Sequence, residues 1–126
     1  MKAILVWAIL VFCTIVPVVA IFVYDAHLND DVTAEILARA PEKGNFLPRN
    51  VTVKAGEKVI LRVRNVDTVT HGFAIPDLGV EGRDIKAGRQ SMVEFVAKEP
   101  GDYDFYCTAW CGDNHLQMRG VITVVR

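Results

Sequence analysis

Two cysteines, a histidine and a methionine gather in one short stretch of this 126-residue chain, residues 107–118, which reads CTAWCGDNHLQM. The Gly-Asp-Asn sequence in its middle favours a loop, because these residues are poor helix formers. The residues just before it, 102–106, alternate along Asp-Tyr-Asp-Phe-Tyr with the period of a β-strand. The sequence therefore predicts a strand that runs into a loop carrying four side chains with metal-binding atoms.

Two other interpretations of this stretch are open. If it were an α-helix, positions 107, 111, 115 and 118 would share one face, and their side chains would simply be buried. The second interpretation is a disulfide between Cys107 and Cys111, which an oxidising compartment would permit. The disulfide leaves His115 and Met118 without a role.

The four side chains form a set that suits copper. Thiolate and thioether are soft ligands and imidazole is borderline, which favours copper or zinc over magnesium or calcium. Methionine favours copper between these two, because structural zinc sites take cysteine or histidine in that place. His71, in the sequence VTHGFAIP at the start of a predicted strand, is the candidate for one further strong ligand. The remaining histidine, His27, lies beside the apolar N-terminal segment.

The number of cysteines distinguishes two kinds of copper site. One cysteine, two histidines and a weak axial methionine make a mononuclear blue-copper centre. Cys111, His71, His115 and Met118 would be enough for that centre, and Cys107 is then surplus. Two thiolates on one tight loop can instead bridge a pair of copper ions, each with its own imidazole. The sequence therefore predicts a dinuclear site.

About residues 46–126 resemble the CuA domain of heme-copper oxidase subunit II and, less closely, the CuA domain of nitrous oxide reductase. The resemblance lies in HGFAIPDLGV at 71–80, in AGRQ at 87–90 and in the copper loop at 100–118. It implies six ligands for two copper ions: bridging thiolates from Cys107 and Cys111, one imidazole each from His71 and His115, and weak axial ligands from the Met118 thioether and the Ala109 carbonyl.

The sequence departs from this family at two places. Subunit II proteins commonly carry glutamate where this chain has Ala109, and that carboxylate binds a magnesium ion against subunit I. Ala109 offers no such carboxylate. The run of Trp and Tyr that precedes the domain in many subunit II proteins is also absent. Trp110, between the two cysteines, is either a packing residue or a contact on a docking surface.

The resemblance implies electron transfer: the chain would be the electron-entry subunit II of a terminal heme-copper oxidase. Its donor would be cytochrome c or a small copper protein, and its acceptor the heme of subunit I. The alternative is a free-standing tethered CuA cupredoxin that serves another reductase, or a copper-delivery protein. The sequence offers no general base, nucleophile or open coordination position, so we expect no catalysis by the chain alone. The net charge is -1 and the sequence has no Lys/Arg cluster, so we expect no basic patch of the kind that binds nucleic acid.

Residues 3–24 contain no charged side chain. A helix of this length, at about 1.5 Å per residue, spans roughly 33 Å, which exceeds the ~30 Å hydrocarbon core of a bilayer. We expect residues 1–24 to form a single transmembrane anchor. A cleaved signal peptide is the alternative, with Lys2 as its positive end and VVA at 18–20 as its cleavage site. The apolar run continues past that site, which favours the anchor.

Charge at the two ends of this segment predicts its orientation in the cell membrane. Lys2 and the amino terminus precede it, whereas Asp25, Asp30 and Asp31 follow it. Positive residues are retained on the cytoplasmic side of membranes. We therefore expect a cytoplasmic N-terminus and a copper domain on the outer side.

The rest of the chain is predicted to be mainly β. Residues 25–45 would connect the anchor to the domain and hold a short helix over 32–40, with Asp31 as its N-cap, stopped by Pro41 and Gly44. From residue 46 onward, short alternating segments are separated by turns, for example Val59, Leu61 and Val63 between polar neighbours. This spacing predicts a cupredoxin-like Greek-key sandwich or barrel over residues 46–126.

Overall fold

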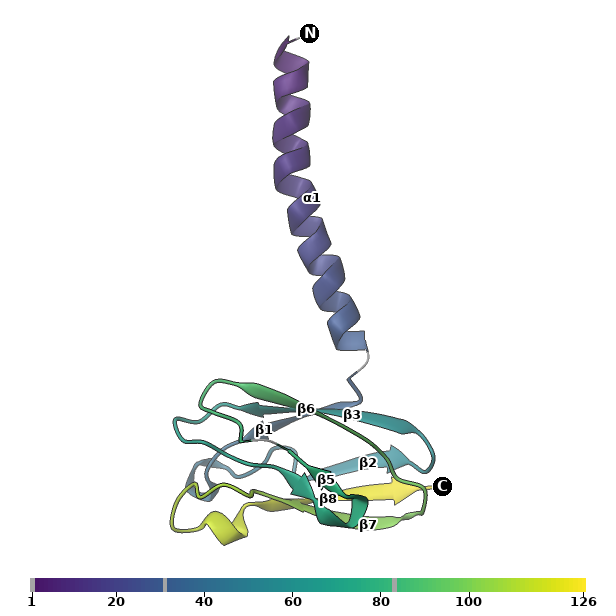
Figure 1. Ribbon diagram of the computed structural model, residues 1–126, viewed down its shortest axis with the longest axis vertical. Helices are drawn as coiled ribbons and strands as arrows, with labels where there is room; N and C mark the ends of the chain where they lie inside the picture. Colours follow the sequence, from purple (N-terminus) through teal and green to yellow (C-terminus); the bar gives the residue numbers. More distant parts are fainter. Residues whose placement is uncertain (1, 31, 83) are drawn as a thin grey trace. The chain divides into compact units, whose positions relative to one another are not determined.

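The computed structural model describes residues 2–30, 32–82 and 84–126 (Figure 1). They fall into two compact units, Met1–Asp31 and Val32–Arg126. The first unit contains a helix and the second contains strands.

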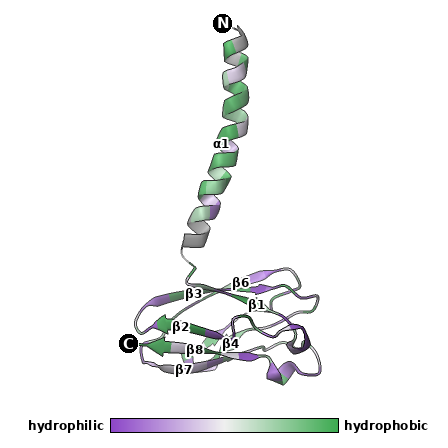
Figure 2. Cartoon of the chain, turned by 180° about the vertical axis from the view of Figure 1, so that it is seen from behind, coloured by the Kyte–Doolittle hydropathy of each residue, from purple (hydrophilic) through white to green (hydrophobic). Residues whose placement is uncertain are grey.

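The first unit is one α-helix, α1 (Lys2–Asp30), which ends beyond the expected boundary at residue 24. Within the described part of the chain, its segment Val6–Ala26 is the stretch long and apolar enough to cross a membrane, with a mean hydropathy of 2.8. Apolar residues follow one another along most of this helix, which is mainly green in Figure 2. An unbroken apolar run lies on every side of a helix and not on one face. A helix that is apolar on every side is suited to lipid, so α1 could anchor the protein in a membrane.

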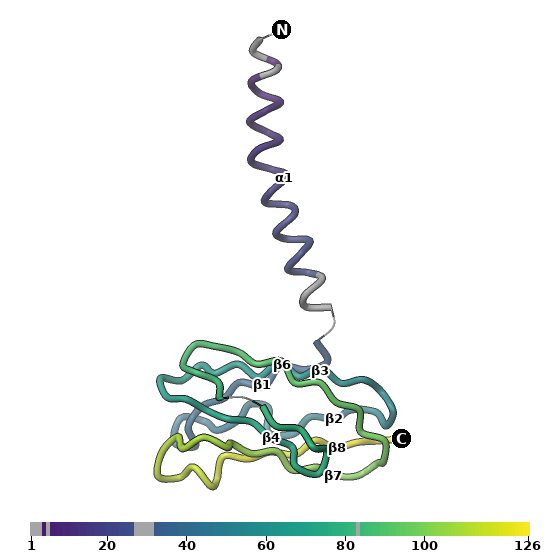
Figure 3. The backbone as a smooth tube through the Cα atoms, in the orientation of Figure 1, coloured from purple at the N-terminus to yellow at the C-terminus, as the bar shows by residue number. Residues whose placement is uncertain are grey.

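The second unit is a two-layered β-sandwich (Figure 3). Its strands are β1 (Ala34–Ala38), β2 (Asn50–Lys54), β3 (Lys58–Asn65), β4 (Ala74–Ile75), β5 (Val80–Glu81), β6 (Gln90–Val96), β7 (Gly101–Tyr106) and β8 (Arg119–Val125). One sheet has the order β1-β3-β6 and the other β2-β8-β7-β4-β5. The β1–β3 and β2–β8 pairs are parallel, and the other pairs are antiparallel. The predicted mainly β sandwich is confirmed.

Alternate residues of the strands fill the space between the sheets. Val59, Leu61 and Val63 of β3 are buried, as their spacing predicts. Three phenylalanines, Phe46, Phe73 and Phe105, are fully buried, and their ring centroids lie 5.1 to 5.8 Å apart. Phe73 follows His71 by two residues and Phe105 precedes Cys107 by two. The same aromatic cluster therefore supports both segments that carry the predicted ligands.

The helix predicted over residues 32–40 is wrong, because part of this segment forms strand β1. Ile36 and Ala38 are fully buried, which is the period of a strand rather than a helix. β3 supplies the backbone partners along β1, and Thr33 N–H donates to the Ile60 carbonyl at 2.8 Å. Tertiary pairing overrides local helix preference here. Asp31, the expected N-cap, lies outside the described residues.

Candidate metal centre

Two neighbouring parts of the sandwich bring the predicted ligands together. His71 follows β3 and forms a two-way bridge with Ile85, with N···O distances of 3.1 and 2.7 Å. Cys107 follows β7 and Met118 precedes β8, and these strands are antiparallel neighbours. Cys107 N–H donates to the Met118 carbonyl at 3.0 Å, so the loop between them is closed at its base. The strand-to-loop arrangement predicted for this stretch is confirmed.

All six residues singled out from the sequence converge in the structure. Their donor atoms are joined by five short distances: Cys107 Sγ to Cys111 Sγ 3.9 Å, Cys107 Sγ to His71 Nδ1 3.9 Å, Cys111 Sγ to His115 Nδ1 3.5 Å, Cys111 Sγ to Met118 Sδ 3.6 Å, and Cys107 Sγ to the Ala109 carbonyl 3.1 Å. Each cysteine therefore faces one histidine through that residue's Nδ1 atom. The two thiols therefore lie next to each other, with one imidazole beside each of them.

The two other interpretations of the cysteine stretch do not match the structure. The stretch is a loop whose regular part is one short 3₁₀ turn, His115–Gln117, so the shared helical face is wrong. Cys107 and Cys111 are free thiols. Their 3.9 Å separation is well beyond the ~2.05 Å of a disulfide.

Close packing between the two ligand segments depends on Gly72. Its N–H donates to Cys107 Sγ at 3.3 Å. A Cβ atom at this position would collide with Thr108 Oγ1 and lie 2.9 Å from the backbone nitrogens of Thr108 and Ala109. The missing side chain of Gly72 therefore lets the cysteine loop lie directly on the segment that carries His71.

His71 is fully buried, and its two ring nitrogens face different groups. Nδ1 faces Cys107, whereas Nε2 lies 3.4 Å from Asp67 Oδ2. Burial lowers the pKa of His71 because desolvation disfavours the imidazolium, although Asp67 opposes the shift. The ring is therefore held neutral, with Nε2 placed to donate to Asp67 and a lone pair on Nδ1 for a metal ion.

Asp67 is a buried residue of this site that sequence reasoning missed. Burial raises the pKa of its carboxyl, but hydrogen bonds from Lys43, the Ala40 and Thr68 N–H groups, and His71 outweigh that effect and hold the pKa well below its usual range. Its place four residues before His71 is the signal in the sequence. That signal is weak, because the partners Lys43 and Ala40 are distant in sequence.

Burial raises the pKa of the Cys111 thiol to about 12, and the neighbouring Cys107 adds to the shift. Without a metal this thiol stays protonated, and a bound cation would displace the proton. Two thiols, two imidazole nitrogens, a thioether and a carbonyl form a mostly soft donor set with copper preference. The residues present fit copper.

Around His115 the centre approaches the surface. His115 is partly exposed, Trp110 is 73% exposed and Leu116 is 77% exposed. The ring centroids of Trp110 and His115 lie 5.7 Å apart. Trp110 is therefore a surface side chain beside a ligand, and the packing interpretation of this residue is wrong.

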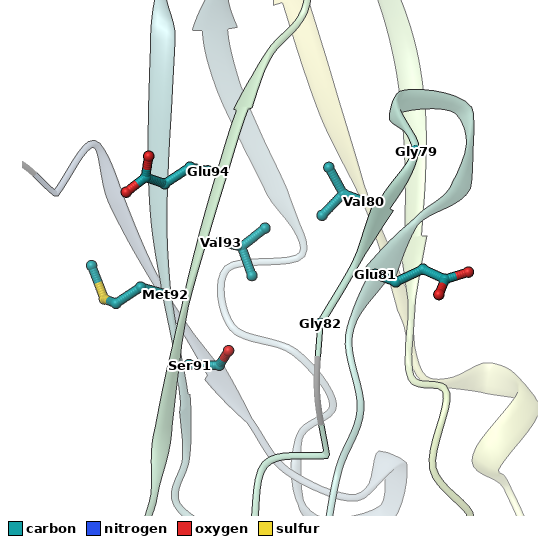
Figure 4. A pocket seen from close by; sticks show the side chains of 8 residues that line it. All are labelled: Gly79, Val80, Glu81, Gly82, Ser91, Met92, Val93 and Glu94. Atoms are coloured by element: carbon teal, nitrogen blue, oxygen red, sulfur yellow. The ribbon is translucent and has the colours of Figure 1, made fainter.

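A separate pocket of about 370 Å³ lies between the edge strands β5 and β6 (Figure 4). Val80 and Val93 point into the gap, while the carboxylates of Glu81 and Glu94 point away from it. Among its described lining residues there is no histidine or cysteine. The chemistry of the described chain is thus concentrated in the cysteine loop rather than in this pocket.

The cupredoxin-like domain family matches residues 4–124, nearly the whole chain. This chain belongs to the cupredoxin family. Nitrous-oxide reductase of Cupriavidus necator is 38% identical to this cupredoxin over 91 residues, which cover 70% of the chain and 14% of the reductase. Cytochrome c oxidase subunit 2 of Thermus thermophilus is 28% identical over 79 residues, which cover 63% of the chain and 57% of the subunit.

Among solved structures, a chain of a heme-copper terminal oxidase dimer shares the cupredoxin fold, with a TM-score of 0.62 and 20% identity over 98% of each chain. The resemblance to the CuA domains of oxidase subunit II and nitrous oxide reductase is confirmed by these relatives. This cupredoxin spans only a small part of the reductase and somewhat more than half of subunit 2. Its homology implies copper electron transfer.

Proposed function

We propose that this cupredoxin holds a dinuclear CuA centre and is the electron-entry subunit II of a terminal heme-copper oxidase. The observation that carries the dinuclear centre is the pairing of thiols with imidazoles. Cys107 Sγ lies 3.9 Å from His71 Nδ1 and Cys111 Sγ lies 3.5 Å from His115 Nδ1, with 3.9 Å between the sulfurs. A mononuclear centre would leave one of these cysteines without a role.

Each residue has a distinct part in this proposal. The thiolates of Cys107 and Cys111 would hold both copper ions, and His71 and His115 would each bind one of them. The Met118 thioether and the Ala109 carbonyl would be additional weak ligands, one for each copper ion. The bound copper pair supplies the one-electron redox change, and the protein holds the ligands rigidly so that little rearrangement accompanies it. Ala109 contributes its main chain alone, so its side chain offers no carboxylate for magnesium.

The proposed partners follow from the helix and the relatives. α1 would anchor the chain in the cell membrane. Lys2 precedes its uncharged stretch 3–24 and Asp25 follows that stretch, which favours a cytoplasmic N-terminus. The cupredoxin domain would then lie on the outer side. Cytochrome c or a small copper protein would donate electrons there, and heme-containing subunit I would accept them.

A second candidate is a free-standing tethered CuA cupredoxin that serves another reductase, or a protein that delivers copper. The reductase candidate is favoured by the higher identity to nitrous-oxide reductase, 38% against 28% for subunit 2. Extraction of the chain from native membranes with mild detergent distinguishes the candidates. Heme-containing subunit I should accompany it if the oxidase proposal is right. A fully copper-loaded chain that emerges alone excludes that proposal.

Copper counting tests the dinuclear centre. The purified full chain should bind two copper ions, and its electron paramagnetic resonance spectrum should show one electron shared by both nuclei. Cys107→Ser should leave a single-ion spectrum, because one bridging thiolate is lost. Cys13→Ser, a cysteine in α1, is the matched control and should keep the shared-electron spectrum. One copper ion per wild-type chain with a single-ion spectrum would refute the proposal.

A further inference from the structure

The loop of residues 40–45, between β1 and β2, contacts both segments that carry the predicted ligands. We call it the strap. At one end it holds Asp67, whose Oδ1 lies 2.6 Å from Lys43 Nζ and whose Oδ2 accepts the Ala40 N–H at 2.9 Å. The same Oδ2 lies 3.4 Å from His71 Nε2. Asp67 therefore connects the strap to the buried imidazole of His71.

The strap also binds the cysteine loop. Asn45 Nδ2 donates to the Gln117 carbonyl at 2.8 Å, next to Met118 in the chain. Asn114, which precedes His115, donates through Nδ2 to Glu42 Oε1 at 2.6 Å. Three side chains of one short loop, Glu42, Lys43 and Asn45, thus connect it to both halves of the site.

Hydrogen bonds within the strap give it one shape. Lys43 N–H donates to the Ala40 carbonyl at 2.8 Å, and Asn45 N–H donates to the same carbonyl at 3.2 Å. Asn45 has a φ of 66° and is buried, and its Oδ1 accepts the Phe46 N–H at 2.7 Å. Asparagine is among the few residues that adopt this left-handed backbone readily. Phe46 then enters the aromatic core, so the strap is joined to the rigid part of the sandwich.

We propose that the strap is a positioning element that fixes the distance between the two halves of the metal centre. Lys43 and the Ala40 N–H hold the Asp67 carboxylate, and Asp67 orients His71 so that Nδ1 faces Cys107. Asn45 and Glu42 hold the turn that carries His115. Carboxylate partners of ligating histidines set ring orientation and basicity, and their loss commonly lowers metal affinity about 10- to 100-fold. The expected effect of the strap on copper binding rests on the proposed copper centre. Its expected effect on the orientation of His71 does not, because that orientation can be measured in the metal-free protein.

Lys43→Ala tests the Asp67 end of the strap. Lys43 is about half exposed, so the substitution should not prevent folding. Lys58→Ala is the matched control, because Lys58 Nζ pairs with Glu94 at 2.9 Å on the β3–β6 sheet and is similarly exposed. In ¹⁵N-labelled, metal-free full chain in detergent, Lys43→Ala should speed solvent exchange of the His71 Nε2 proton and shift its resonance. Lys43→Arg should restore the wild-type signal, and Lys58→Ala should not change it.

Asn45→Gly tests the other end, because glycine tolerates the positive φ while it removes the bond to Gln117. This variant should shift the resonances of His115 and Met118 and leave those of His71 unchanged.

Copper binding is the second measurement on Lys43→Ala. This variant should bind copper about 10-fold more weakly than the wild-type chain, with an unchanged number of copper ions and a shifted reduction potential.

If Lys43→Ala and Asn45→Gly behave like Lys58→Ala in the nuclear magnetic resonance and copper measurements, the strap is an ordinary surface loop and the proposal is overturned. A wild-type chain that binds one copper ion would refute the dinuclear function instead. The metal-free measurement on His71 would still decide the strap proposal in that case.

Discussion

His71 and His115 each face one cysteine of the same centre, yet their surroundings are opposite. His71 is fully buried, with Asp67 Oδ2 3.4 Å from its Nε2 and the fully buried Phe73 two residues further along the chain. His115 is partly exposed, on a short 3₁₀ turn next to the exposed ring of Trp110. The centre therefore has an inner half within the packed sandwich and an outer half at the surface.

This difference separates two requirements of an electron-transfer site. A constant ligand geometry needs a dry, packed environment in which side chains have one conformation, and the inner half provides it. Approach of a partner protein needs a ligand near the surface, and the outer half provides that through His115 and its apolar neighbours Trp110 and Leu116. Enrichment of tryptophan at interface centres supports docking at the outer half.

Removal of the two imidazoles, one at a time, should damage the centre most. His71→Gly should lose the copper centre, and added imidazole should not restore it, because the cavity left behind is closed to solvent. His115→Gly should also lose the native spectrum, but imidazole in solution should restore it, since this ligand reaches the surface. Optical and paramagnetic resonance titration with imidazole measures both. Equal rescue of the two variants would show that the inner and outer halves do not differ in access.

Gly72→Ala should be the next most damaging change, because its Cβ has no room against Thr108 and the Ala109 nitrogen. Overpacking of this kind costs about 1–3 kcal/mol of unfolding free energy. We also expect this clash to displace the cysteine loop, which would break the hydrogen bond from the residue 72 N–H to Cys107 Sγ and weaken copper binding. Chemical unfolding of the metal-free chain and a copper titration measure the two effects. Unchanged stability would mean that the inner half is less tightly packed than the structure indicates.

Met118→Leu should have a smaller effect on stability. Met118 is fully buried, and leucine has a similar volume, so we expect a loss below about 1.5 kcal/mol. An axial thioether is a weak ligand that mainly tunes the reduction potential. Copper should therefore still bind while the potential changes, which voltammetry and metal analysis would show. Loss of copper as complete as in Cys111→Ala would contradict a tuning role for Met118.

The smallest structural effect is expected for Trp110→Leu. The side chain is 73% exposed, so thermal stability should change by no more than about 0.5 kcal/mol and copper content should not change. Electron transfer with the physiological partner should slow, because a flat apolar contact at the outer half is lost. Stopped-flow kinetics per copper-loaded molecule measure this rate. An unaffected rate would show that Trp110 is not part of the docking surface.

Local patterns carried most of what could be predicted. The alternation of Val59, Leu61 and Val63 placed them in the core, because a strand turns successive side chains to opposite faces. The spacing from Cys107 to Met118 marked a loop of soft ligands, because the side chains themselves carry that chemistry. The short apolar pattern of residues 32–40 predicts a helix where the structure has strand β1, since such a pattern fits both structures and the deciding partner, β3, lies elsewhere in the chain.

Residue types and short-range patterns are enough to predict the candidate donor atoms, the loop that carries most of them, the apolar helix and the mainly β character. Each of these depends on residue type or on neighbours close in the chain. Packing between distant segments, in contrast, places Gly72 against the cysteine loop, turns Asp67 towards His71 and lets the strap contact both halves. These contacts link residues far apart in sequence, and they exist because the packed sheets bring particular backbone segments within hydrogen-bonding distance. No local period or spacing encodes such a distance, so the environment of each histidine could be known only after the chain had folded.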